Sequence, residues 1–170
     1  MHREHLLQPM DHAREVLHRM LEATPREHWR HQPVPGGNHV AWTVGHLAWA
    51  DDLVLRAVGE PGGLPEPEVW EARFAWRTRP DAGTADAMPA AGSGPDDDEL
   101  LRVLQDRRSA LRGWLSALPE PRLAETPPAD LAGWVPVLGA LPGALAAHDG
   151  MHVGQLQVVR KALGLAPVFM

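Results

Sequence analysis

Apolar residues recur at helical spacing in several separate stretches of this chain, and no stretch shows the strict alternation of a half-buried β-strand. The clearest stretch is residues 95–119. Acidic residues crowd its first turn, where they complement the helix dipole, and Pro119 closes it. Its apolar stripe consists of Leu100, Leu104, Leu111, Leu115 and Leu118.

Three further stretches show the same period. Residues 2–24 predict a first helix, although Pro9 should weaken its first turns. A second helix is expected from an N-cap at Asn38 to about Val58. The last begins near Leu141 and ends at Gly164, a plausible residue just beyond a helix end. The apolar face of the first is formed by Leu6, Met10, Ala13, Leu17, Met20 and Leu21.

These helices predict a single domain over residues 1–170 with an all-α fold, a four-helix bundle. Residues 61–95 are rich in proline and glycine and read as a long irregular crossover between helices two and three, and residues 119–140 as a second loop. With tyrosine and isoleucine absent, the core must use Leu, Ala, Val, Met and the 7 Trp, which we expect in the core or an interface rather than in a cofactor cage.

Charge and composition exclude several partners. A net charge of -6 argues against nucleic acid, which normally requires a basic face. Because the chain has 0 Cys, a metal site would have to use histidine, carboxylates or water. No leader-like start and no run of about 18 apolar residues is present, so we expect a cytoplasmic protein without a membrane partner.

Two histidines stand one turn apart in the last predicted helix. His148 and His152 share its apolar face, so both imidazoles should point into the bundle. A divalent metal bound by one nitrogen of each ring would satisfy both, although hydrogen-bonded core histidines without metal are the simpler alternative. Gly150 and Gly154 project away from this face and should permit close helix packing or a dimer contact.

A metal site needs at least a third ligand, and no His, Asp or Glu follows His152. The best upstream candidate is His46, which points inward from the middle of the second helix, with Gly45 beside it to allow a close approach. His39, two turns away, is too far to share the ion but near enough to line the entrance. Solvated or capping roles are favoured for the amino-terminal histidines, His2, His5, His12, His18, His28 and His31.

The segments "WTVGHLAWADDL" and "AAHDGMHVGQLQVVRKALG" resemble the DinB/YfiT-like superfamily of small bacterial metal-binding four-helix bundles over nearly the whole chain. The match puts His46, His148 and His152 at the three ligand positions, and Gly154 and Gln155 match the G-Q that follows. This resemblance implies a divalent ion, often nickel or zinc, with one or more positions open to water, and frequent homodimers.

The same resemblance implies small-molecule chemistry without naming the reaction. Related branches include thiol-dependent transferases that use bacillithiol or mycothiol, and other members are described as metal-dependent hydrolases or damage-inducible proteins. A water or the thiolate of a low-molecular-weight cosubstrate would fit an open position on the ion. The competing interpretation is a non-catalytic stress-response protein in which the ion ties two helices together.

Hydrolysis would also need a general base, and the sequence offers no obvious one. Asp51, Asp52 and Asp149 all project away from the histidine faces, which favours surface or supporting positions for them. "HDGMH" differs from the H-E-x-x-H of zinc proteases and is followed by no third ligand. The second helix is apolar nearly all round and predicts a homodimer interface, with packing inside the chain as an equal alternative.

Overall fold

The structure, a computed structural model, describes residues 3–34, 37–78 and 94–169. Within these ranges the chain is all-helical and has no strand, which confirms the predicted fold class. Short 3-10 helices occupy several of the connections. The α-helices are α1 (Arg3–Glu22), α2 (Val40–Ala57), α3 (Pro67–Phe74), α4 (Asp97–Ala117) and α5 (Leu141–Ala162).

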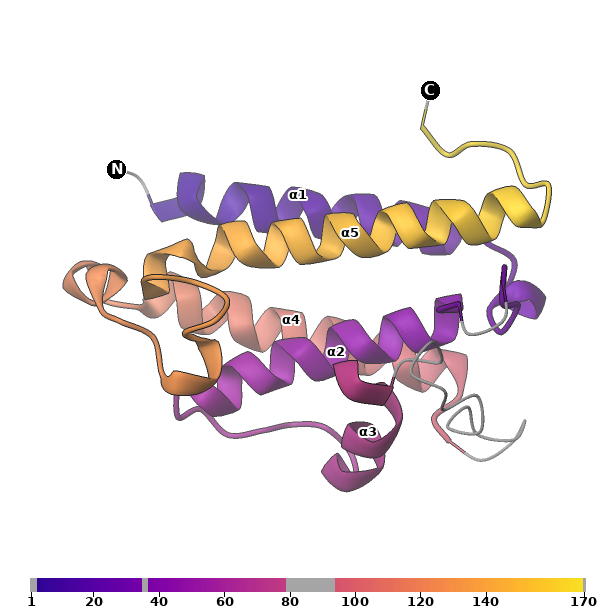
Figure 1. Ribbon diagram of the computed structural model, residues 1–170. Coiled ribbons are helices and arrows are strands. Elements are labelled where there is room, and N and C mark those ends of the chain that lie inside the picture. Colours follow the sequence, from indigo (N-terminus) through magenta and orange to yellow (C-terminus); the bar gives the residue numbers. More distant parts are fainter. Residues whose placement is uncertain (1–2, 35–36, 79–93, 170) are drawn as a thin grey trace.

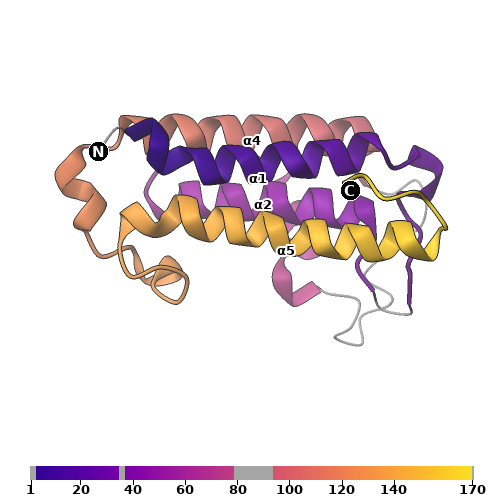
Figure 2. The same ribbon diagram turned by 90° about the horizontal axis from the view of Figure 1, so that it is seen from above.

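The four long helices form two layers. α1 lies beside α5 in one layer, and α2 lies beside α4 in the other (Figures 1 and 2). α3 is outside this bundle and packs against α2 (Figure 1). The layers meet over leucine, methionine and tryptophan side chains, among them Leu17, Met20, Trp42, Leu104 and Leu156. The interior between α2 and α5 is therefore the place where side chains of both predicted histidine segments can meet.

The ends of the later helices follow from local sequence. Asp96 caps α4, because its carboxylate accepts a hydrogen bond from the Glu99 amide at 2.8 Å. Gly164 follows α5 with a φ of 70°, a conformation that glycine adopts without strain. α1 continues through Pro9, since the buried side chains of Leu7 and Met10 hold both flanks of the proline against the core.

The start of α2 differs from the prediction. The N-cap is His39 rather than Asn38, and the His39 Nδ1 atom accepts a hydrogen bond from the Trp42 amide at 3.0 Å. The Asn38 side chain turns toward α5 instead, where its amide donates to Gln155 at 3.1 Å. A contact between distant segments thus overrides the local preference of asparagine for the cap.

The crossover between α2 and α4 was predicted to be irregular throughout, and part of it is helical instead. It contains α3 and a 3-10 helix at Trp76–Thr78, whereas residues 79–93 of the predicted loop lie outside the described residues. α3 is only 8 residues long and buries just Trp70 and Phe74. So short a helix is marginal by itself, and its contacts with α2 stabilise it.

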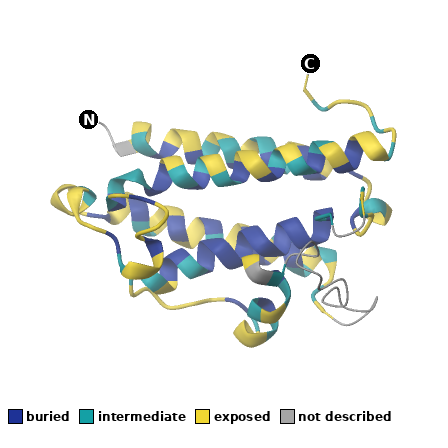
Figure 3. Ribbon diagram, viewed as in Figure 1, coloured by how far each residue is buried: buried dark blue, intermediate teal, exposed yellow. Residues whose placement is uncertain are grey.

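α2 is buried on nearly all sides within one chain (Figure 3). The second apolar face, which includes Val40, Val44 and Leu47, packs inside the chain, as the alternative interpretation required. The homodimer stays a prediction that this face no longer supports. In the described parts of the chain, no helix combines the length and the apolar character needed to cross a membrane.

Candidate metal centre

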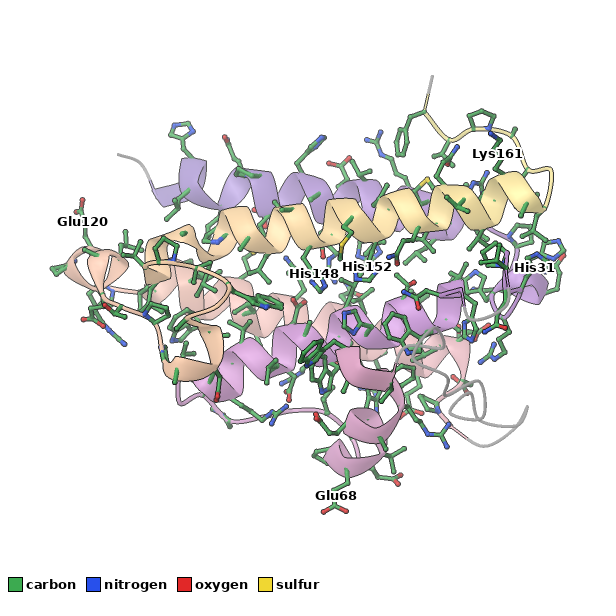
Figure 4. The ribbon with its side chains drawn as sticks, in the orientation of Figure 1. His31, Glu68, Glu120, His148, His152 and Lys161 are labelled. Atoms are coloured by element: carbon green, nitrogen blue, oxygen red, sulfur yellow. The ribbon has the colours of Figure 1, made fainter. Side chains whose placement is uncertain are left out.

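The three histidines singled out in the sequence lie together inside the bundle. His46 comes from α2, and His148 and His152 point from α5 toward α2 (Figure 4). The His148 Nε2 atom is 3.3 Å from that of His46 and 3.1 Å from that of His152. All three ligand atoms lie within 4.8 Å of one another, so the group could hold a metal ion.

The other ring nitrogen of two of these histidines is fixed by an oxygen. His46 Nδ1 donates to the Phe74 carbonyl at 2.7 Å, and His152 Nδ1 donates to the Gln155 side-chain carbonyl at 2.9 Å. A carbonyl oxygen can only accept, so each Nδ1 carries a proton, and in the neutral ring Nε2 then carries the lone pair. The contacts that orient these rings therefore also select the tautomer in which Nε2 can bind a metal.

The spacing of the Nε2 atoms fits a divalent ion. Zn–N bonds of about 2.0–2.1 Å in tetrahedral geometry separate ligand nitrogens by about 3.3 Å, close to the distances around His148. Without a metal, a proton on His148 Nε2 could be donated to either His46 or His152 but not to both. A cation would accept the lone pairs of all three rings at once. Burial lowers the pKa of His148 and so favours the neutral form that a metal requires.

α3 supports the histidine that comes from α2. Two tryptophans of α2 donate hydrogen bonds to the carboxyl-terminal half of α3. Trp42 Nε1 donates to the Arg73 carbonyl at 3.1 Å, and Trp49 Nε1 donates to the Glu71 carboxylate at 2.5 Å. Trp42 also stacks on the His46 ring with a centroid separation of 4.6 Å. Together with the Phe74 carbonyl, these contacts hold His46 in one orientation.

Gly45 allows α3 to lie this close. A Cβ atom at this position would overlap the ring of Phe74, so only glycine lets the Phe74 side chain pack directly on the α2 backbone. The predicted close approach at Gly45 is confirmed. By contrast, Gly150 and Gly154 are exposed, with nothing within 4 Å of a Cβ placed there, so they serve no close packing inside the chain. A dimer contact at these two glycines stays a prediction.

A cavity of about 580 Å³ opens onto two of the three histidines. His46 and His148 form part of its wall, and Trp134 lies beside His148 with ring centroids 5.4 Å apart. His39, predicted at the entrance, is instead buried at the start of α2 and does not line the cavity. The other lining residues are Trp49, Leu53, Trp76, Asp130, Ala144, Ala147 and Met151.

Some tryptophans are buried in the core, as the sequence predicted, and others are exposed where they line the cavity, which it did not predict. Trp29, Trp42, Trp49 and Trp70 are buried in the core as expected. Trp76 and Trp134, however, are 67% and 44% exposed at the mouth of the cavity. Both lie in the connections around 3-10 helices, where no periodic pattern indicates a direction for the side chain.

The carboxylates considered as bases are occupied elsewhere. Asp51 and Asp149 are at most 1% exposed and pair with Arg14 and Arg108 at 2.9–3.2 Å. The surface position considered for them is therefore wrong. We call Arg14, Asp51, Arg108 and Asp149 the ionic quartet, one member from each long helix.

Asp52, the third carboxylate, is also buried and paired. It accepts hydrogen bonds from Arg56 at 2.9 Å and from the Gly63 amide at 2.8 Å. Asp130, which the sequence analysis did not consider, is the one carboxylate among the described residues that line the cavity.

The remaining histidines take no part in the triad. His5, His12 and His31 are exposed and His18 and His28 are partly buried, in keeping with solvated positions for most of them. Burial lowers the pKa of His18. His2 lies outside the described residues.

Comparison with known proteins identifies one family. The chain matches the family described as the DinB superfamily over residues 10–156. No curated protein and no solved structure matches it. The matched range includes His46, His148 and His152, so all three histidines lie in the part of the chain that the family accounts for.

Proposed function

The chain belongs to the DinB superfamily, and from this premise we propose that it is a metal-dependent enzyme in which His46, His148 and His152 hold a zinc or nickel ion. The proposed reaction transfers a low-molecular-weight thiol to a small electrophilic substrate. The observation that carries this proposal is the cavity of about 580 Å³ that opens onto His46 and His148. A purely structural ion would need no such access.

The residues around the triad suit this chemistry. When bound, a divalent ion supplies a Lewis acid that lowers the pKa of a thiol or water placed in an open position. Three neutral imidazoles leave the positive charge of the ion uncompensated, which favours a thiolate partner. The indole and aliphatic side chains of the cavity wall surround the reacting groups with apolar surface.

Thiol transfer is preferred to hydrolysis because of where the carboxylates lie. Metal-dependent hydrolysis is assisted by a general base near the attacking water, and Asp51, Asp52 and Asp149 are all engaged with arginine side chains. A thiol ionises far more easily than water, so the metal alone activates it and the thiol proton passes to solvent. Hydrolysis remains the second candidate on a single observation, the carboxylate of Asp130 on the cavity wall. We place the thiol reaction in the cytoplasm, where small thiols are kept reduced.

A turnover screen tests the proposal. The zinc-loaded and nickel-loaded proteins would be assayed with cysteine, glutathione and related small thiols against 1-chloro-2,4-dinitrobenzene, and with 4-nitrophenyl acetate and an anilide in separate reactions. We expect thiol-dependent arylation that chelation abolishes and that the H148A variant lacks. Ester or anilide cleavage without thiol would instead support hydrolysis.

The competing assignment is a stress-response protein with a structural ion. It predicts that chelation lowers the melting temperature while no substrate is turned over under any condition. Chelator-sensitive melting together with an inactive screen would therefore replace the enzyme proposal with this one.

A further inference from the structure

Exposed apolar side chains gather at the mouth of the cavity. Trp76, Trp134 and Met151 are 67%, 44% and 47% exposed, and all three line it. Two indoles held in solvent at one opening are unusual for a surface that binds nothing, because tryptophan is normally buried or at an interface. The mouth is therefore built to cover an apolar ligand.

One carboxylate lines the same cavity as the tryptophans. Among the described side chains of its wall, Asp130, in the 3-10 helix Ala129–Leu131, is the single acidic one and none is a lysine or arginine. The faces of indole rings are electron-rich and attract cations. A carboxylate beside tryptophans thus makes the outer part of the cavity complementary to a positive ligand group.

The two ends of the cavity differ in chemistry. Its inner wall includes the imidazoles of His46 and His148. A metal ion held by these histidines would attract a ligand group that donates an electron pair. Trp134 connects the two ends, since its ring lies 5.4 Å from that of His148 while the residue is 44% exposed. A ligand that fits both ends carries a donor group inward and a cationic group outward.

We propose that the cavity takes an organic cation, an amine or quaternary ammonium group on an apolar body, with the ammonium held by Trp76, Trp134 and Asp130. The proposal rests on the proposed function in that it treats this cavity as the substrate site. It names the class of substrate and makes Trp134 and Asp130 the residues that determine specificity.

Binding of benzyltrimethylammonium tests this proposal. Its affinity for the metal-loaded and the metal-free protein would be measured by calorimetry, beside that of 2-methyl-1-phenylpropan-2-ol, a neutral molecule of nearly the same shape. We expect the cation to bind about tenfold more tightly than the alcohol, and the Asp130→Asn and Trp134→Ala variants to weaken it about fivefold each.

Matched variants serve as controls. Asp106→Asn removes a carboxylate on α4 that pairs with Arg102, and Phe169→Ala removes an aromatic residue as exposed as Trp134, at 44%. Neither should alter binding. Equal affinities for the cation and the alcohol, or an Asp130→Asn effect no larger than that of Asp106→Asn, would overturn the proposal.

Failure of the proposed function looks different. If the transfer reaction does not occur but the cation still binds with this preference, the inference about the cavity stands and the enzyme assignment is wrong. If metal and turnover are retained without any preference for the cation, the inference alone is wrong.

Discussion

The bundle contains two clusters of buried polar side chains, and they are built in opposite ways. The histidine triad consists of imidazoles from α2 and α5, and a cavity opens onto it. The ionic quartet consists of two arginines and two aspartates whose side chains are at most 8% exposed. One cluster borders a cavity and is composed of imidazoles, whereas the other is closed and composed of opposite charges.

The two clusters differ in whether their own side chains balance their charges and lone pairs. The quartet is neutral as a unit, because two guanidinium groups face two carboxylates. The triad brings three ring nitrogens close together and has no carboxylate among its three members, so a cation from outside would complete it. His148 and Asp149 are adjacent in sequence yet belong to different clusters, since each residue advances about 100° around a helix.

Breaking the quartet should have the largest effect. Asp51→Asn keeps the shape but leaves the charges of Arg14 and Arg108 incompletely compensated in the interior, so we expect a loss of about 3–5 kcal/mol in the free energy of unfolding. Urea denaturation measures it. The exposed pair of Asp106 with Arg102 is the control, and Asp106→Asn should cost less than about 1 kcal/mol. Equal losses in the two variants would show that the quartet is not the stabilising unit described here.

A buried histidine outside the triad gives the next prediction. Burial and the nearby Arg30 lower the pKa of His39 to about 4, whereas the unfolded chain has a value near 6.5. The unfolded state therefore takes up its proton first as the pH falls, and stability should decrease between pH 6.5 and 4 by up to about 3 kcal/mol.

His39→Asn keeps a capping side chain without a titrating ring. The slope of stability against pH in this range should become shallower in that variant, as followed by denaturation at several pH values. His31→Asn, at an exposed position, should leave the slope unchanged. If the two variants behave alike, the cap does not control the pH dependence.

Two glycines in different surroundings should respond to substitution in opposite ways. Gly45→Ala would place a methyl group against Phe74, so we expect a loss of about 1–3 kcal/mol and weaker metal binding as α3 shifts from His46. Gly150→Ala meets open space in the middle of a helix and should stabilise by about 0.5–1 kcal/mol. Thermal unfolding of both variants decides, and a destabilising Gly150→Ala would point to a contact such as the predicted dimer.

Gln155 tests the triad without disturbing the quartet. Its side-chain carbonyl holds His152 in the tautomer that can bind a metal, and removing such a supporting contact typically weakens metal binding about 10–100-fold. Gln155→Leu should therefore lower zinc affinity in a chelator competition, while loss of the bond from Asn38 should cost only about 1 kcal/mol in unfolding. Gln157→Leu on the same helix is the comparison, and similar affinities in the two variants would contradict this role.

The sequence predicted the parts of the molecule that depend on local pattern. Helical projection placed His148 and His152 on one face and His46 on another inward face, because rotation along a helix is fixed by covalent geometry. α3 escaped prediction because it is short and is stabilised by contacts with α2 rather than by its own sequence. The N-cap at His39 was not predicted for a similar reason, since the side chain of Asn38 contacts Gln155 of a distant helix.

The quartet could not be derived in the same way. Aspartate on the outer side of a projected helix favours a surface position, and only the packing of four helices shows that Asp51 and Asp149 face two arginines instead. The cavity wall has the same origin, because the fold brings Trp76, from the connection between α3 and α4, together with Asp130 and Trp134, from the connection between α4 and α5.

Metal content is the most direct test of the central claim, that the triad and not the quartet needs an ion. The protein would be prepared without a histidine tag, dialysed against zinc or nickel and analysed for bound metal, beside a folded His148→Ala variant. We expect about one tightly bound divalent ion per chain in the native protein and none in the variant. Equal metal content in the two preparations, whether empty or filled, would contradict it.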